Sequence, residues 1–164
     1  MIKARLKKIL INFTIILFIF LTDRISKIYI LKIAELESAV DIYLTPYLNL
    51  YLIWNKGIAF GLLNFDESFV YNIISLVIAA VTIVILVMII RSNGAKMYSL
   101  IFVFGGSIGN LFDRIYYSAV PDFIDFHINN FHWFTFNIAD IFISLGIIFV
   151  LLNELTYKKQ KNEN

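Results

Sequence analysis

A few polar side chains interrupt the long apolar runs of this chain, and their types and spacing suit hydrolysis of a peptide bond. Asp140 lies in FNIADIFIS between apolar neighbours, with no cation nearby in its own segment. Its candidate partners are Asp122 and Asp125 in VPDFIDF, and the residue types do not choose between them. Two carboxylates close together in a partly dry site cannot both ionise easily, so one keeps a proton. Such a pair activates water with its ionised member and polarises a carbonyl with its protonated member.

Other catalytic chemistries have less support among the residues of the chain. Cysteine is absent, which excludes a cysteine nucleophile, a thiolate metal site and disulfides. Ser107 and Ser144 have no obvious base near them in the sequence. We interpret His127 and His132, five residues apart, as interfacial residues of an outer loop rather than metal ligands. The sequence therefore predicts no bound metal and no cofactor.

The overall composition is that of a membrane protein. Of the 164 residues, 60% are hydrophobic and 16% charged, and the mean hydropathy is +0.79. Soluble domains carry roughly 45–50% apolar and about 25% charged residues. This difference excludes a soluble enzyme, a disordered chain and a nucleic-acid binder with a basic face. We predict a single integral membrane domain over residues 1–164.

Four segments are long and apolar enough to cross a bilayer as helices, which takes about 20 residues each. They are residues 9–31, 69–90, 97–117 and 134–155. The basic start followed by an apolar run imitates a signal peptide, but no small-residue cleavage site follows, so we expect an uncleaved first span. The predicted fold class is an all-α membrane protein with four transmembrane helices and a small β element.

The β element is expected in the first outer segment, residues 33–68. Within it, residues 43–54 (YLTPYLNLYLIW) are rich in leucine and aromatic residues, which favours short strands. Aromatic side chains also suit the headgroup layer of a membrane. We expect a small sheet resting on the outer leaflet, with a re-entrant loop as the alternative. The second outer segment is residues 118–133.

The positions of Lys and Arg predict the orientation, because cytoplasmic loops are enriched in them. Three segments on one side of a four-span chain hold most of the basic residues: Lys3, Arg5, Lys7, Lys8, Arg91, Lys96, Lys158, Lys159 and Lys161. The first outer segment is acidic, with Glu35, Glu37, Asp41, Asp66 and Glu67. Both termini are therefore predicted to be cytoplasmic.

Three of the predicted helices carry polar residues near their outer ends. These residues, spaced three or four apart on shared faces, are Asp23 and Lys27, then Asn110, Asp113 and Arg114, then Asn137 and Asp140. Each group also has a structural interpretation. Asp23 and Lys27 could form a structural ion pair. Asp113 and Arg114, which are adjacent, could form an exposed structural pair. Asn110 and Asn137 suit hydrogen bonds between helices, and Gly105 with Gly109 suits close helix packing. Convergence of all three groups at one depth favours a site.

Five motifs in order carry a resemblance to a known family. They are DRISK (residues 23–27), NKGIAFG (55–61), GGSIGNLFDR (105–114), VPDFIDF (120–126) and FNIAD (136–140). Together they resemble the motifs of lipoprotein signal peptidase, or signal peptidase II. The resemblance implies an aspartic endopeptidase of the bacterial plasma (inner) membrane. Its substrate is a diacylglyceryl-modified prolipoprotein, cut just before the lipidated cysteine. Family members have four transmembrane helices, a small outer β-cradle and a mobile outer segment.

The resemblance also implies roles for individual residues. Matched position by position, Asp122 and Asp140 are catalytic, which selects Asp122 over Asp125. Positions that shape or contact the substrate site are Asp23, Asn55, Gly57, Asn110, Arg114 and Asn137, while Lys27 and Asp113 are structural supports. Pro121 departs from the family, in which an aliphatic residue is usual; it fixes φ and removes a donor, so we expect altered geometry before Asp122. The expected partners are prolipoproteins and membrane lipids, without nucleic acid, and the expected state is a monomer.

Two other functions fit a small membrane protein with buried carboxylates. Intramembrane aspartates serve proton relays in carriers and channels, which would distribute polar groups across the membrane depth. The segment 69–90 carries no charge, and the other polar groups cluster at one end. A structural or assembly protein would leave Asp140 and the motif at 55–61 unexplained. Both alternatives therefore fit less well than a peptidase.

Overall fold

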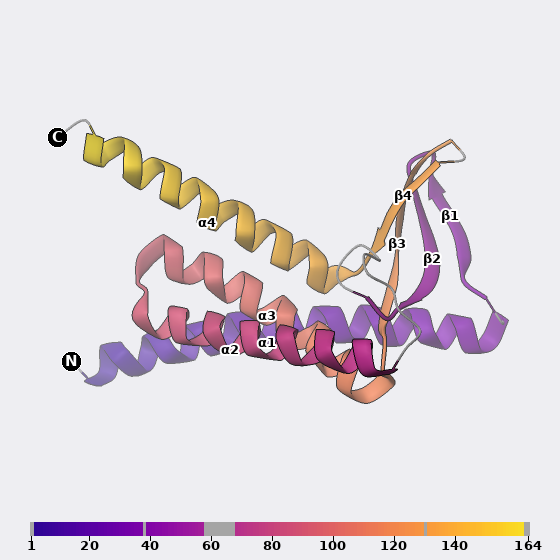
Figure 1. Cartoon of the computed structure of the whole chain (residues 1–164), viewed down its shortest axis with the longest axis horizontal. Helices are drawn as coiled ribbons and strands as arrows, with labels where there is room; N and C mark the ends of the chain where they lie inside the picture. The colour runs from indigo at the N-terminus through magenta and orange to yellow at the C-terminus, as the bar shows by residue number, and fades with distance from the viewer. Residues whose placement is uncertain (1, 38, 58–67, 130, 163–164) are drawn as a thin grey trace.

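A computed structural model describes residues 2–37, 39–57, 68–129 and 131–162 of the chain. In chain order the elements are α1 (Ile2–Glu37), β1 (Asp41–Thr45), β2 (Leu48–Asn55), α2 (Ser68–Arg91), α3 (Gly94–Tyr117), β3 (Val120–Ile128), β4 (Phe131–Phe136) and α4 (Ile138–Asn162). The sheet lies toward one end of the molecule, whereas both termini and the α2–α3 connection lie toward the other (Figure 1). This arrangement separates the basic segments of the chain from the sheet.

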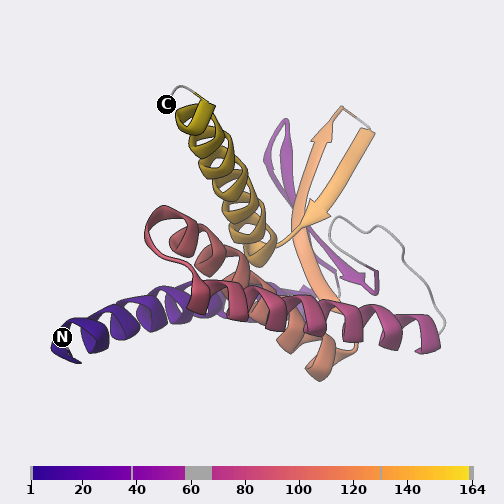
Figure 2. The ribbon, with the colours of Figure 1, turned by 60° about the vertical axis from the view of Figure 1, so that its left-hand side comes forward.

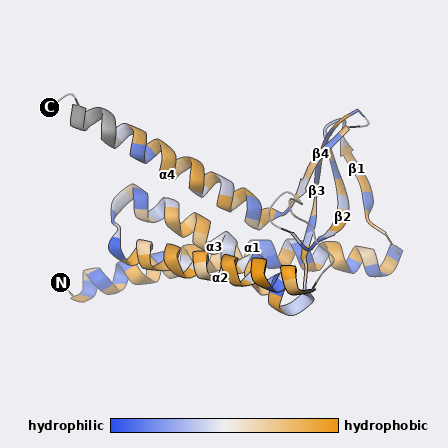
Figure 3. Cartoon of the chain, viewed as in Figure 1, coloured by the Kyte–Doolittle hydropathy of each residue, from blue (hydrophilic) through white to orange (hydrophobic). Residues whose placement is uncertain are grey.

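Three helices among the described residues are long and apolar enough to cross a membrane. They are α1, residues Phe69–Arg91 of α2 and residues Ile138–Thr156 of α4. Coloured by hydropathy, α2 is apolar over most of its length (Figure 3). Many of its large apolar side chains are exposed, among them Phe69 and Leu76, which suits a lipid environment. Helix α3 has the same length as α2 but is not among the three, so a fourth span stays a prediction.

One predicted segment boundary was wrong. The first helix, Ile2–Glu37, contains the predicted span of residues 9–31 and extends beyond it at both ends. The last helix begins at Ile138 rather than at residue 134, because Phe134–Phe136 complete β4. The aromatic run before Asn137 has strand propensity, and Asn137 then begins the helix. Hydropathy alone cannot separate an aromatic strand from the start of an apolar helix.

The four strands form one antiparallel sheet in the order β1-β2-β3-β4. Strands β1 and β2 confirm the β element predicted within residues 43–54. Strand β3 returns after α2 and α3 to pair with β2, with Ile53 opposite Asp122 and Trp54 opposite Pro121. Strand β4 pairs with β3 only from Ile124 onward. Pro121 therefore lies where β3 has a single neighbour, and such a position tolerates a missing backbone donor.

Helix α3 is the centre of the helical part, with contacts to α1, α2 and α4. Its glycines allow close approach. A Cβ on Gly105 would lie 3.0 Å from Ile19 of α1, and a Cβ on Gly106 would lie 2.4 Å from the carbonyl oxygen of Ala139 in α4. A Cβ on Gly109 would lie 2.7 Å from an Asp23 carboxylate oxygen. The close packing predicted for Gly105 and Gly109 is confirmed.

Helix α4 begins beside the sheet and runs away from it at an angle to α2, as two views of the molecule show (Figures 1 and 2). Its first turn lies against the α3 glycines, since Ala139 is fully buried next to Gly106. Contact with α3 therefore helps to fix the start of α4.

We expect Gly106→Ala to lower the thermal unfolding midpoint of the detergent-purified protein by several degrees. The new methyl group would overlap a backbone carbonyl of α4, which cannot rotate away, and overpacking of this kind typically costs about 1–3 kcal/mol. Gly105→Ala is the matched control on the same helix, because its neighbour is the Ile19 side chain. Equal losses in the two variants would contradict the close α3–α4 contact.

Candidate active site

The first turn of α4 is held by a reciprocal capping arrangement. The backbone N–H of Asp140 donates to Asn137 Oδ1 at 3.0 Å, and the backbone N–H of Asn137 donates to Asp140 Oδ2 at 3.2 Å. A polar residue at the N-cap with an acidic residue three positions later is a capping box. The local sequence NIAD therefore both starts the helix and fixes one carboxylate at its N-terminus.

The side chain of Asn137 also reaches Asp122, on β3. Its amide nitrogen Nδ2 donates to Asp122 Oδ1 at 2.6 Å. The amide of Asn55, at the end of β2, donates to Asp122 Oδ2 at 2.8 Å. Asp122 and Asp140 are 2% and 3% exposed. A single asparagine thus binds both carboxylates, that of Asp122 through its side chain and that of Asp140 through its backbone N–H.

The second oxygen of Asp140 is bound from α3. Asn110 Nδ2 donates to Asp140 Oδ1 at 2.8 Å, and Lys27 Nζ donates to Asn110 Oδ1 at 2.9 Å. This hydrogen bond between α3 and α4 fits the interhelical role considered for Asn110. All four carboxylate oxygens of Asp122 and Asp140 therefore accept a hydrogen bond from an asparagine.

Behind these asparagines lies a buried cluster of four charges. Lys27 Nζ lies 2.9 Å from Asp23 and 2.6 Å from Asp113. Arg24 approaches the same two carboxylates at 2.8 and 2.5 Å. The cluster has two positive and two negative charges, as a buried group must to avoid an uncompensated charge. The ion pair of Asp23 with Lys27 is confirmed.

The exposed pair predicted for Asp113 and Arg114 was wrong. Asp113 is 0% and Arg114 5% exposed, and Asp113 bonds to α1 instead of its neighbour. Adjacent residues on a helix point about 100° apart, so they face different partners. Arg24, which sequence analysis did not single out, supplies one of those partners; its position next to Asp23 was the available signal.

Arg114 lies on the side of the site nearest the start of the motif at 55–61. Its Nη2 donates to the carbonyl oxygen of Gly57, whose own N–H donates to Asn55 Oδ1 at 2.8 Å. Tyr71 of α2 donates its hydroxyl to the Arg114 carbonyl at 3.0 Å. Arg114 Nε and Nη1 are buried and have no hydrogen-bond partner among the residues that the structure describes. Residues 58–61 of the motif lie outside the described residues.

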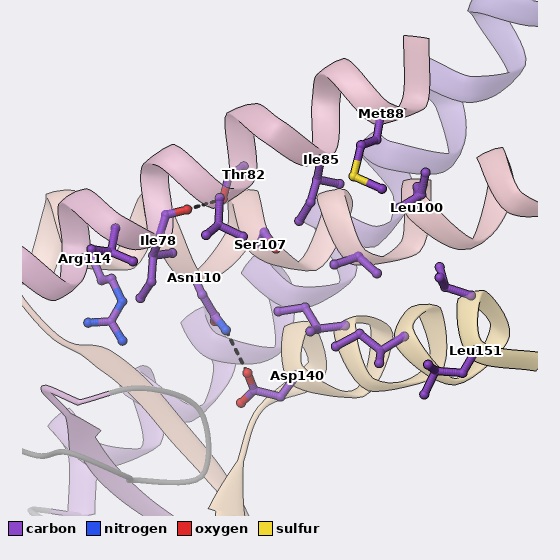
Figure 4. A pocket seen from close by; sticks show the side chains of 16 residues that line it. Ile78, Thr82, Ile85, Met88, Leu100, Ser107, Asn110, Arg114, Asp140 and Leu151 are labelled. Carbon is purple, nitrogen blue, oxygen red and sulfur yellow. Dashed lines mark hydrogen bonds between the residues drawn. The ribbon is translucent and has the colours of Figure 1, made fainter. Parts of the chain in front are cut away.

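An elongated apolar cavity of about 460 Å³ reaches the Asp140 carboxylate between α2, α3 and α4. Asn110, Arg114 and Asp140 lie at one end of it, while Met88, Leu100 and Leu151 lie at the other (Figure 4). The remaining lining is almost entirely aliphatic. Such a cavity suits an apolar segment that presents one polar group to the carboxylate.

The surroundings of Asp122 raise the pKa of its carboxyl from the usual 3.8 to about 7. Burial is the main cause, and the negative charge of Asp140 adds to it. Hydrogen bonds from Asn55 and Asn137 and the positive charge of Lys27 act in the opposite direction. Two carboxyl groups coupled in this way hold one proton between them near neutral pH.

Asp125, the alternative partner considered from the sequence, has different neighbours. Its Oδ2 lies 2.7 Å from His132 Nδ1, and it lines a separate groove with residues of β1 and β2. The geometry therefore groups Asp122, and not Asp125, with Asn137 and Asp140. His127 and His132 both lie on strands, β3 and β4, within the second outer segment.

Comparison with known proteins gives a consistent result. Residues 15–156 match the family model described as Signal peptidase (SPase) II. The chain is 50% identical over 159 residues to a lipoprotein signal peptidase of Pelagibacter ubique, covering 97% of this chain and 96% of the relative. It is 38% identical over 159 residues to a lipoprotein signal peptidase of Anaplasma phagocytophilum, covering 96% and 99%.

Solved structures share this fold. One described as a bacterial membrane enzyme has a TM-score of 0.72 at 24% identity, covering 93% of this chain and 92% of the other. A second, described in the same words, has a TM-score of 0.65 at 25% identity, covering 88% and 92%. The likeness extends over both the helices and the sheet, since so little of either chain is left out.

Replacing Asp122 by Asn should change how stability depends on pH. With a pKa of about 7 when folded and 3.8 as the reference value, the native carboxyl holds a proton that the unfolded chain has lost. The wild type therefore loses stability as pH rises from about 4 to 7. Relative to wild type, the unfolding midpoint of Asp122→Asn should rise over that window and stay constant above it. The exposed Asp41→Asn is the control, and a difference independent of pH would contradict the assignment.

Proposed function

Since the chain belongs to the signal peptidase II family, and is thus a membrane protease that removes signal peptides from prolipoproteins, we propose that it does so by an aspartic mechanism. Asp122 and Asp140 form the catalytic pair. The observation that carries this proposal is Asn137, which hydrogen-bonds to both carboxylates at 2.6 and 3.2 Å. Of the two carboxylates, Asp140 lines the apolar cavity, and Asn137 joins Asp122 to it.

The proton of the pair resides on Asp122. Helix N-termini stabilise negative charge, and Asp140 lies in the first turn of α4 with acceptor bonds from Asn137 and Asn110. Burial raises the pKa of the Asp122 carboxyl to about 7, so Asp122 can keep a proton near neutral pH. Asp140 is therefore the general base, and Asp122 is the acid that polarises the scissile carbonyl.

The reaction then follows from these two assignments. Asp140 takes a proton from a water molecule as the water oxygen bonds to the carbonyl carbon, while Asp122 hydrogen-bonds to the carbonyl oxygen and transfers its proton as the tetrahedral intermediate forms. Collapse of the intermediate breaks the C–N bond. The proton held by Asp140 passes to the leaving nitrogen, and Asp122 recovers its proton from the intermediate. The products are a signal peptide with a new carboxylate and a lipoprotein with a free amino terminus.

The substrate is the diacylglyceryl-modified form of the prolipoprotein, cut just before its lipidated cysteine. The apolar signal segment occupies the cavity between α2, α3 and α4, where most lining side chains away from Asn110, Arg114 and Asp140 are aliphatic. Arg114 lines this cavity, and its Nε and Nη1, which have no hydrogen-bond partner within the described part of the chain, donate to a backbone carbonyl or to the lipid ester. Asn55, Asn110 and Asn137 hold the carboxylates in place.

Gly57 and Asp23 have different parts in this mechanism. Gly57 accepts from Arg114 through its carbonyl and so orients the guanidinium toward the substrate. Asp23 was expected to shape or contact the substrate site, but it is 0% exposed and accepts the backbone N–H of Ala139 at 3.0 Å. We assign Asp23 as a positioning residue for the start of α4, supported by Lys27 and Asp113.

In the membrane, the protein forms one domain over residues 1–164 with four spans, acting as a monomer in the bacterial inner membrane. Both termini and the α2–α3 connection face the cytoplasm, as their Lys and Arg residues favour. The sheet rests as a cradle on the outer leaflet, so the carboxylates lie near the extracytoplasmic surface. Water reaches the site from that surface while the lipid chains of the substrate stay in the bilayer.

The decisive test is cleavage of a synthetic or purified diacylglyceryl-prolipoprotein by the detergent-purified enzyme. Asp122→Asn and Asp140→Asn should each lower kcat by at least ~100-fold, the scale of general acid–base catalysis, while the protein stays folded. Asp41→Asn, on β1 and away from the cavity, should keep the wild-type rate. Wild-type turnover in either variant of the pair would show that the catalytic assignment is wrong.

The membrane topology can be tested by labelling single introduced cysteines. No background labelling of the protein is expected, because the chain has no cysteine. Lys3→Cys and Ser92→Cys should react with a membrane-impermeant maleimide only after the cells are opened, and Tyr43→Cys should react in intact spheroplasts. Tyr43 is 67% exposed on β1, so labelling at this position reports which side of the membrane it faces and not whether it is buried. Labelling of Lys3→Cys in intact spheroplasts would overturn the orientation.

A further inference from the structure

A second cluster of titratable side chains lies on the β3–β4 hairpin, outside the proposed catalytic pair. Asp125 and His127 are two residues apart on β3 and so share a face of the sheet. His132 on β4 is paired directly with His127. One ligand atom from each of the three residues can be chosen so that all lie within 4.8 Å of one another. The three residues, which are separated along the sequence, thus lie close together across the hairpin.

The atoms of this group face one another closely. Asp125 Oδ2 lies 2.7 Å from His132 Nδ1 and 3.4 Å from His127 Nδ1. The two imidazole rings are stacked with centroids 5.4 Å apart. Asp125 is 1% and His127 6% exposed. His127 Nδ1 is buried and has no hydrogen-bond partner among the described residues, so a buried donor–acceptor atom points into the group unsatisfied.

We propose that Asp125, His127 and His132 bind a divalent transition-metal ion, with Zn²⁺ as the ion that the donor set fits. Zinc takes His nitrogen at about 2.0–2.1 Å and carboxylate oxygen at about 2.0–2.2 Å, so two ligand atoms on one tetrahedral ion lie roughly 3.4 Å apart. Asp125 Oδ2 and His127 Nδ1 are already at that separation. An ion between them satisfies the unpartnered nitrogen of His127.

His132 completes the ligand set by a small rotation. Its side chain is 59% exposed, so the ring is free to move from its 2.7 Å hydrogen bond to the wider spacing of two ligands on one ion. Three protein ligands leave a coordination position for water, as is common in sites of two histidines and one carboxylate. The buried Asp125 carboxylate would supply the negative charge that a divalent ion requires.

The groove beside the group provides access and a polar surrounding. It is about 530 Å³ in volume and is lined by Asp125 and His132 together with residues of β1, β2 and β4. Asn49, paired with Asp125 across β2 and β3, has a buried Oδ1 with no hydrogen-bond partner among the described residues. This oxygen can accept from a metal-bound water. None of the residues lining this groove lines the cavity at Asp140.

The place of the three ligands in the chain suggests what a bound ion would do to the structure. The hairpin lies between Asp122 and Asp140, and a metal joining β3 to β4 would hold that connection rigid. The site is a structural clamp and takes no part in bond cleavage. The inference stands apart from the proposed mechanism, because metal binding can be measured without substrate.

The test is metal titration of the full-length protein, purified in detergent without a histidine tag, stripped with EDTA and then freed of it. Co²⁺ followed by its visible absorption, and Zn²⁺ followed by calorimetry, should each bind at one equivalent. His127→Gln and His132→Gln should each weaken binding at least ~10-fold, since each removes a ligand. Asp41→Asn, a carboxylate of the same groove, is the matched control and should bind as wild type does.

Two results would overturn the proposal. One is the absence of saturable binding to the wild type. The other is an unchanged affinity in His132→Gln, a change at an exposed side chain that leaves folding intact. An unfolding midpoint measured without metal checks the folding of His127→Gln, and if that variant does not fold, the result for His132→Gln decides.

Discussion

The structure depends on keeping four charges of α1 and α3 inside an apolar helical bundle, which is costly unless the charges are paired. Lys27, Asp23 and Asp113 are each 0% exposed, and removing one member of such a buried group typically costs 3–5 kcal/mol. The cluster joins α1 to α3 at one level. Since Lys27 also donates to Asn110, and Asp23 accepts from Ala139, the same charges fix α3 and α4 relative to α1.

That constraint explains why asparagines surround the two catalytic carboxylates of the proposal. An amide donor hydrogen-bonds to a carboxylate without adding a positive charge, which is compatible with the single proton that the proposed mechanism places on the pair. A lysine or arginine in direct contact would instead favour ionisation of both. Lys27 donates to Asn110, which in turn donates to Asp140. Burial raises the pKa of Asp122 and the charge of Lys27 lowers it, and the resulting pKa lies near neutrality.

The sequence predicts the helices well, because apolar runs of about 20 residues have few other interpretations in a chain of this composition. It fails at residues 134–137, where an aromatic strand and an apolar helix have the same hydropathy. The polar residues of three helices could be grouped by depth, yet their partners could not be inferred. Asp113 illustrates this, because its partners Arg24 and Lys27 come from a helix some 90 positions earlier in the chain. Pairing between Asn55 and Asp122 likewise depends on β2–β3 register, which no local pattern specifies.

The hairpin between Asp122 and Asp140 has a further effect on the site. One carboxylate is carried by β3 and the other by α4, so their separation depends on two elements of different kinds. Asn137 connects the two elements, because its Oδ1 caps α4 and its Nδ2 binds Asp122. A single side chain therefore converts the strand-to-helix junction into a fixed distance between the two acids. Because the same residue must be an amide to donate and accept at once, aspartate or leucine at this position would preserve at most one of the two contacts.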